Sequence, residues 1–180
     1  MRPDKETEIQ HEDFTLTVRG AVRGERPLLA RRVADPDVMR EVQIATAALL
    51  VEMAGSDEHV DEMERETALR LVRKAFRFST EQASQIIEAA NLLRDAMYSV
   101  EDFTSVLLGA LPHEERKMLL AMVSRVMIAD GIVSNSEQHF THRLQKLLQL
   151  SESDERDAFQ LAVLASKVGQ IIETDFPRAT

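Results

Sequence analysis

The sequence predicts an all-α fold of about seven helices, arranged as two pseudo-symmetric three-helix halves joined by a central helix. Aromatic residues make up only 4% of the 180 residues, whereas good helix formers such as Leu, Ala, Met and Glu are abundant. Apolar residues recur at helical spacing in successive segments, and most segments open with a residue type that caps helices. A similar loop occurs twice, which predicts the two halves.

The two loops lie 73 residues apart, at positions 56–64 (SDEHVDEME) and 129–137 (ADGIVSNSE). The second ends in the capping box Ser134-x-x-Glu137, and the first ends in its aspartate version, Asp61-x-x-Glu64. Gly131 suits the left-handed conformation that often ends a helix. Each loop is therefore predicted to be a tight corner between two helices.

The first half is predicted to hold three helices. Asp35 is a good N-cap and Pro36 suits the first helical position, so the first helix runs from there to about Ala54. The second runs from Asp61 to about Phe76. The third opens with a capping box at residues 79–82 (STEQ).

The central helix is expected to start at Ser99, and the first helix of the second half follows Pro112. The next helix follows the second loop, and the last begins at Ser151. The apolar stripe after the second loop includes Leu144, Leu147 and Leu148, and is predicted to match the stripe of the earlier helix that includes Val72 and Ala75. Glu64 lies 15 residues before Ser79, but Glu137 lies 14 before Ser151, so one residue must be absorbed near a helix end.

Residues 1–34 differ from the rest. Positions 4–13 are acidic, whereas positions 19–32 carry five arginines and one glutamate. The alternating stretch 14–18 (FTLTV) resembles a strand, but a lone strand is unstable in water. We predict a mobile N-terminal arm over 1–34 and a helical domain over 35–175, with a basic docking segment as the alternative for the arm.

Composition excludes several classes of function. The formal net charge of -9 disfavours nucleic acid as the main partner and is compatible with cations or basic protein surfaces. Without cysteine there is no disulfide, thiol nucleophile or cysteine-based zinc site. No signal peptide and no transmembrane segment is recognised, so a cytoplasmic protein is expected. No phosphate-binding loop or nucleophile elbow is present, so no enzymatic activity is expected.

The acidic residues Asp57 and Asp130 stand where the preceding helix ends. A negative charge there opposes the helix macrodipole by about 0.3–1 kcal/mol. Two explanations remain open. A divalent cation can bridge each aspartate to the following glutamate, Glu64 or Glu137, with loop carbonyls completing an oxygen shell. Alternatively, each aspartate is solvated and accepts a hydrogen bond from a loop N–H.

Several blocks of sequence resemble the tellurite-resistance TerB family, in order and spacing, across roughly residues 40–160. These blocks are 47–52 (AALLVE), the first loop, 76–79 (FRFS), 102–104 (DFT), 111–116 (LPHEER), and 129–131 (ADG) with Glu137. The resemblance implies an all-helical domain associated with tellurite and other stress resistance. It also implies a relationship to the N-terminal domain of DjlA-type co-chaperones and no established enzymatic activity.

The resemblance further implies a divalent-metal site, of unknown metal, built from the loop carboxylates Asp57, Glu64, Asp130 and Glu137. The first loop departs from the family pattern, because Glu58 stands where glycine is usual. Glu58 and His59 are two further candidate ligands. Asp130 and Glu137 are expected to be the better half of any cation site.

The function expected is therefore that of a non-enzymatic, stress-associated domain that binds a divalent cation and a protein partner through its acidic corners. A metal-free interaction scaffold, whose acidic surface docks a basic protein, is the alternative. A hydrolase that uses the carboxylates and a metal-bound water is a third possibility.

Overall fold

The computed structural model describes residues 28–55 and 62–175, and within these ranges it contains seven α-helices and no strand. The predicted all-α fold is confirmed. None of the helices in the described ranges is both long and apolar enough to cross a membrane. The helices are α2 (Pro36–Ala54), α3 (Glu62–Phe76), α4 (Thr80–Asp95), α5 (Val100–Ala110), α6 (His113–Met127), α7 (Asn135–Leu147) and α8 (Glu152–Asp175).

Short polar side chains fix where the helices begin. The Asp35 carboxylate accepts hydrogen bonds from the N–H groups of Asp37 and Val38 at the start of α2. Four later helices begin with a capping pair of residues. In each pair, the hydroxyl of the capping serine accepts a hydrogen bond from the backbone N–H of the third helical residue, and the side chain of that residue accepts one from the serine N–H. These pairs are Ser79–Gln82, Ser99–Asp102, Ser134–Glu137 and Ser151–Asp154.

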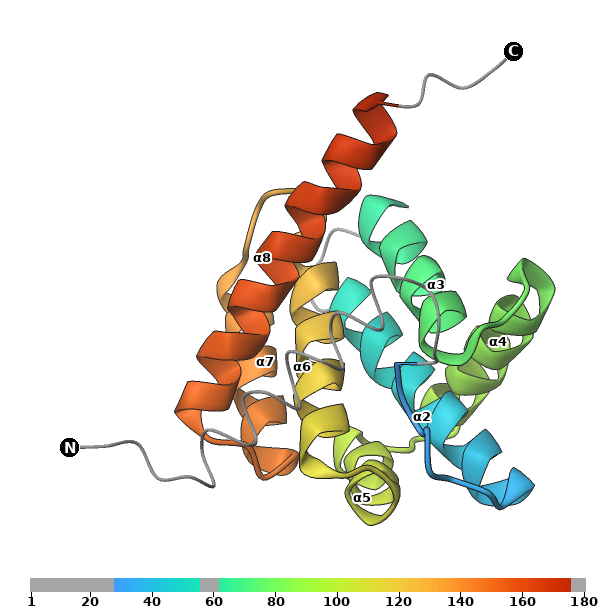
Figure 1. The fold of residues 1–180 in the computed structure, drawn as a ribbon. Helices are drawn as coiled ribbons and strands as arrows, with labels where there is room; N and C mark the ends of the chain where they lie inside the picture. The colour runs from blue at the N-terminus through green and yellow to red at the C-terminus, as the bar shows by residue number, and fades with distance from the viewer. Residues whose placement is uncertain (1–27, 56–61, 176–180) are drawn as a thin grey trace.

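Helices α2 and α6 lie side by side at the centre (Figure 1). Helix α2 also packs against α3, α4 and α5, whereas α6 packs against α3, α7 and, most extensively, α8. Their carboxyl ends point toward the same end of the molecule, so the chain leaves both central helices there (Figure 1). The fully buried side chains of the two central helices include Leu49, Leu50, Met53, Leu119, Leu120 and Val123.

Residues 28–34, which the sequence assigned to a mobile arm, pack on the helical body; we call them the strap. Leu29 and Ala30 are buried. The N–H groups of Leu28 and Leu29 donate to the carbonyl of Ala75, at 3.1 and 3.4 Å. The predicted arm is therefore wrong for these residues, because two apolar side chains reach the core and their backbone finds acceptors there. Residues 1–27 lie outside the described ranges.

The second helices of the two halves, α3 and α7, end in the same way. Arg77 and Gln149 have positive φ angles of 60° and 53°. The following N–H groups, of Phe78 and Leu150, donate back to carbonyls five residues earlier, which is the Schellman motif. Helix α3 has 15 residues and α7 has 13. The segment from Glu64 to Ser79 is one residue longer than the segment from Glu137 to Ser151, and the longer α3 accommodates this difference.

One predicted core position is wrong. Leu144 and Leu148 of α7 are fully buried, but Leu147 is only half-buried. At the constant spacing of 73 residues, Ala75 corresponds to Leu148, whereas Leu147 corresponds to Lys74, which is exposed. The sequence pattern placed Leu147 in the core because three apolar residues near the end of α7 fit helical spacing almost equally well.

Candidate functional site

The corner between α6 and α7 contains Asp130 and Gly131. Gly131 has a φ of +83°, a conformation that a side chain would strain. The Asp130 Oδ1 atom accepts a hydrogen bond of 2.8 Å from the N–H of Ile132. The sequence left two explanations for Asp130, a bound cation or a hydrogen bond from a loop N–H. This contact is such a hydrogen bond, and it uses one of the two carboxylate oxygens.

Glu137 lies beneath this corner, at the third position of α7. Its Oε2 atom accepts a 2.6 Å hydrogen bond from the Ser134 N–H, and its own N–H donates to the Ser134 hydroxyl. The residue is only 1% exposed. Its second oxygen, Oε1, is buried and has no hydrogen-bond partner. Burying a carboxylate oxygen without a hydrogen-bond partner costs free energy of folding. A proton, a water molecule or a cation at this atom would therefore stabilise the folded protein.

The two corners are described to different extents. Glu64, the counterpart of Glu137, is buried at the third position of α3. Asp57, Glu58 and His59 lie outside the described residues, so their positions relative to Glu64 are not defined. In the described part of the chain, no three histidine or carboxylate side chains come together as a metal-binding group. The α6–α7 corner therefore offers two carboxylates, one of them with an unused buried oxygen.

A partly buried group of charged side chains joins α6 to α8, and the sequence did not reveal it. The Lys117 ammonium lies 3.0 Å from Asp157 Oδ2 and 3.3 Å from Asp154 Oδ1. His113 Nε2 lies 3.2 Å from the same Asp154 oxygen. Lys117 is flanked by residues of the apolar face of α6, and this polar residue in a buried stripe was the one available signal.

Opposing effects set the pKa values in this group. Burial raises the pKa of Asp154, but hydrogen bonds from Ser151 and His113 outweigh it and lower the pKa to about 2. Burial likewise lowers the pKa of Lys117, and the contacts with Asp157 and Asp154 reverse this, so its pKa is raised. Both groups are therefore held in their charged forms and stabilise the packing of α8 on α6.

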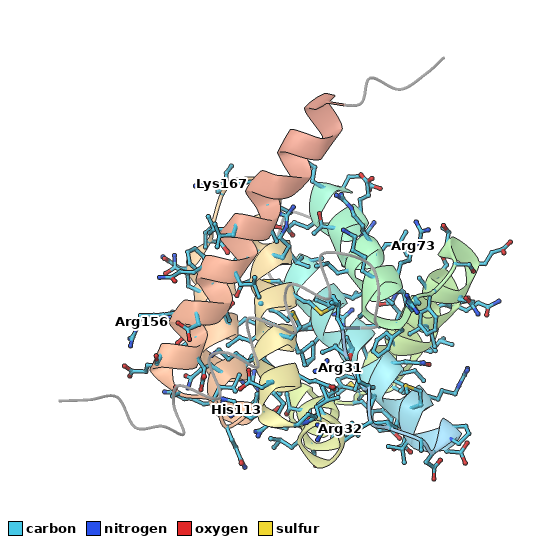
Figure 2. All side chains as sticks on the ribbon, viewed as in Figure 1. Arg31, Arg32, Arg73, His113, Arg156 and Lys167 are labelled. Atoms are coloured by element: carbon cyan, nitrogen blue, oxygen red, sulfur yellow. The ribbon has the colours of Figure 1, made fainter. Side chains whose placement is uncertain are left out.

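Glu115 of α6, which the sequence analysis included only as part of the block 111–116, is a further buried carboxylate. It is 1% exposed, and its Oε2 accepts a 2.7 Å hydrogen bond from the Ala30 N–H. Its Oε1 lies 3.3 Å from both the N–H and the Nε of Arg31. Figure 2 shows Arg31 and Arg32 close together, to the right of α6 and toward α2 in that view. Glu115 therefore anchors the strap.

A hollow between α2, α5 and α7 has Leu49 and Phe103 in its lining. Two ion pairs also line it, Arg94–Glu52 and Arg143–Glu101. The bond to Arg143 lowers the pKa of Glu101. Since these charges are paired with each other, the hollow offers an incoming ligand apolar contacts and few unsatisfied polar groups.

Comparison with known proteins gives one positive result. No curated protein and no solved structure matches the chain. The family of tellurite resistance protein TerB matches residues 43–160, which is more than half of the chain and includes helices α3 to α7 and both corners. This match confirms the resemblance carried by the sequence blocks around the two loops. The chain belongs to the TerB family of tellurite resistance proteins.

Proposed function

We propose that this TerB domain is a binding module, not an enzyme, and that it takes up a divalent cation at the α6–α7 corner. Asp130 and Glu137 are the proposed ligands. The observation that carries the proposal is the Glu137 Oε1 atom, which is buried and has no hydrogen-bond partner. A hard cation that prefers oxygen ligands would satisfy this atom and compensate the buried negative charge.

The chemistry of the corner fits such an ion in part. The second oxygen of Asp130 and the carbonyl groups of the loop are further oxygen donors, of the kind that calcium and magnesium prefer. Two carboxylates alone make a weak site, so more ligands are needed. We propose Glu64 and Asp57, with Glu58 and His59 as further candidates, because α2 and α6 both end toward this end of the molecule (Figure 1).

Thermal melting with added calcium, magnesium, manganese or zinc tests the proposal. A ligand that binds only the folded state stabilises it by about 2.7 kcal/mol at a hundredfold excess over Kd. The melting temperature of the wild-type chain should therefore rise with the cation that fits. If none of the four ions moves it at millimolar concentration, the cation proposal fails and a metal-free scaffold takes its place.

Two conservative variants locate the site. Glu137→Gln keeps an oxygen that can accept from the Ser134 N–H, and Asp130→Asn keeps an oxygen for the Ile132 N–H. Each removes one negative charge and should abolish most of the cation-dependent rise. Asp102→Asn is the matched control, because Asp102 makes the same kind of capping box at an exposed helix start. It should leave the rise unchanged.

A further inference from the structure

Helix α4 lies at the edge of the molecule and packs on α2 and α3 (Figure 1). A hollow of about 600 Å³ opens between these three helices. Its apolar lining includes Val51 and Ala54 of α2, Leu69 of α3 and Ile87 of α4. Leu92 of α4 also lines it, although this leucine is largely exposed. We call this hollow the α4 groove.

Small side chains keep the α4 groove open. Ala54 and Ala68 line it, and the residues 73 positions later are Met127 and Thr141. These larger residues of the second half are buried, and the Thr141 hydroxyl lies 3.5 Å from the Met127 sulfur. The first half thus has space beside α2, whereas the corresponding residues of the second half contact each other. A surface hollow leaves its lining atoms without packing partners, which apolar side chains of a bound partner would supply.

The end of α4 concentrates exposed apolar side chains. Leu92, Met97 and Tyr98 are 64%, 89% and 52% exposed. Met97 also has a φ of +71°, a conformation in which glycine or asparagine is favoured. Met97 and Tyr98 line the hollow between α2, α5 and α7, which shares Arg94 and Asp95 with the α4 groove. The apolar surface therefore continues from the groove past the end of α4.

The charged side chains beside the groove are of both signs. Glu88 and Asp95 line it from α4, and Arg65 lines it from α3. All three are exposed, and in the part of the chain that the structure describes their side chains form no hydrogen bond or ion pair. Glu88 and Asp95 are seven residues apart, which is about 10.5 Å along the helix. Two exposed carboxylates disfavour nucleic acid or anionic lipid as the partner of this surface.

We propose that the α4 groove binds an amphipathic helix of a partner protein. Apolar side chains three, four and seven residues apart on such a helix enter the groove and cover Leu92. A partner helix lying along α4 places two basic residues, seven positions apart, opposite Glu88 and Asp95. An acidic residue on its other flank faces Arg65, so the charges fix the direction of the helix. The groove includes none of the proposed cation ligands, so either proposal can fail without the other.

Fluorescence anisotropy of a labelled peptide with the full chain tests this inference. The peptide forms about five turns of helix, with leucines three, four and seven residues apart on one face. Lysines seven residues apart lie on one flank, and a glutamate lies on the other. The peptide should bind. Exchanging its two lysines for glutamates should weaken binding about tenfold, because two attractions become two repulsions.

Two variants of the chain locate the site. Leu92→Ser removes an exposed apolar contact and should weaken peptide binding about tenfold. Ala54→Met fills the groove with the residue type found at Met127 and should weaken binding at least as much. The matched control is Leu164→Ser, because Leu164 is 60% exposed on α8. It should change the affinity less than twofold. Circular dichroism and thermal melting confirm that each variant is folded.

Several results would overturn the inference. One is the absence of peptide binding, and another is wild-type affinity in a folded Ala54→Met variant. Equal losses in Leu92→Ser and Leu164→Ser would mean that any exposed leucine attracts the peptide. Sedimentation of the chain without peptide should show a monomer. A dimer that Leu92→Ser dissociates would identify a second copy of the chain as the occupant of the groove, and would overturn the inference as well.

Discussion

Helices α3 and α7 follow the two similar loops of the sequence, and their buried positions can be compared at a spacing of 73 residues. Each begins after a corner and buries a glutamate at its third position, Glu64 or Glu137. Three further buried positions correspond at a spacing of 73 residues, whereas buried Thr67 and Leu144 correspond to half-buried Phe140 and Leu71. The three are Ala68, Val72 and Ala75 in α3, and Thr141, Gln145 and Leu148 in α7. Full superposition of the two halves stays a prediction, but the shared pattern shows that both helices present the same face to the centre.

Their outer faces differ. Exposed Lys74 and Arg73 of α3 correspond to Leu147 and Lys146. Arg70 corresponds to Arg143, which pairs with Glu101 of α5. The outer face of α7 thus carries an ion pair to α5, and an apolar residue where α3 has an exposed lysine. The comparison separates the positions that maintain the fold from the positions at which the two halves are free to acquire different binding properties.

The central helices differ in a similar way. Val42 of α2 is a buried apolar residue, and the residue 73 positions later is Glu115 of α6, also buried. The strap contacts α6 near its start, where the Ala30 N–H needs a hydrogen-bond acceptor. Glu115 supplies this acceptor, which an apolar side chain at the same position could not do. Glu115 of α6 thus binds a segment that precedes α2 in the sequence.

The largest expected effect tests the register of the two helices. Leu148→Ala should lower the free energy of unfolding by about 2–5 kcal/mol, because it leaves a cavity in the core. Leu147→Ala should cost less than half as much, since Leu147 is half-buried at the position of Lys74. Urea unfolding of both variants measures the two values. Similar losses would show that the spacing of 73 residues does not hold at the end of α7.

The next effect concerns the strap. Glu115→Ala removes the acceptor of the Ala30 N–H, which lies in a buried place. An unsatisfied buried donor costs about 1–3 kcal/mol, so stability should fall by that amount. Hydrogen exchange at Ala30 and Arg31 should accelerate more than exchange in α4. If both amides stay protected in the variant, another group holds the strap and Glu115 is not its anchor.

Most of the fold could be predicted from the sequence, because helix caps and apolar spacing are local signals. The capping residues Asp35, Ser79, Ser99 and Ser134 each begin a helix at the expected place. The strap could not be predicted in this way. Leu29 lies in a short stretch with three arginines and one proline (RPLLARR), and only the contacts of this stretch with the distant residues Ala75 and Glu115 explain its burial.

The candidate site was predictable to a smaller degree. The sequence identified Asp130 and Glu137, and the structure adds that one oxygen of Glu137 is buried without a partner. Burial of a single atom depends on tertiary packing, which no local pattern encodes. The same reason explains why the contact of Lys117 with Asp154 and Asp157 was missed, since these residues come from helices far apart in the sequence.

The third effect compares the acid response of the two halves. Asp154 and Gln82 stand at the same position of equivalent capping boxes, but only Asp154 titrates. Its pKa in the folded protein is about 2, below the ordinary 3.8. The resulting stabilisation, on the order of 1–2 kcal/mol, is present above about pH 4 and is lost as the pH falls toward 2.

Urea unfolding of the wild type and of Asp154→Asn, repeated at several pH values, measures this contribution. The two proteins should differ most near neutral pH and converge as the pH approaches 2. Asp102→Asn serves as the control, because Asp102 is exposed and its loss should change the acid dependence much less. A constant difference between wild type and Asp154→Asn at every pH would show that packing, and not charge, makes Asp154 important.

The smallest effect tests the outer face of α3 directly. Lys74→Gln removes the like charge four residues after Arg70 on the same helix, and should raise the free energy of unfolding by about 0.2–0.5 kcal/mol at low salt. The gain should shrink in high salt, because exposed charges are screened there. The matched change on the other helix is Lys146→Gln, at the position of Arg73. It should gain less, because Arg143, three residues earlier, is already paired with Glu101. A loss of stability in Lys74→Gln at low salt would mean that Lys74 makes a favourable interaction that outweighs its repulsion by Arg70.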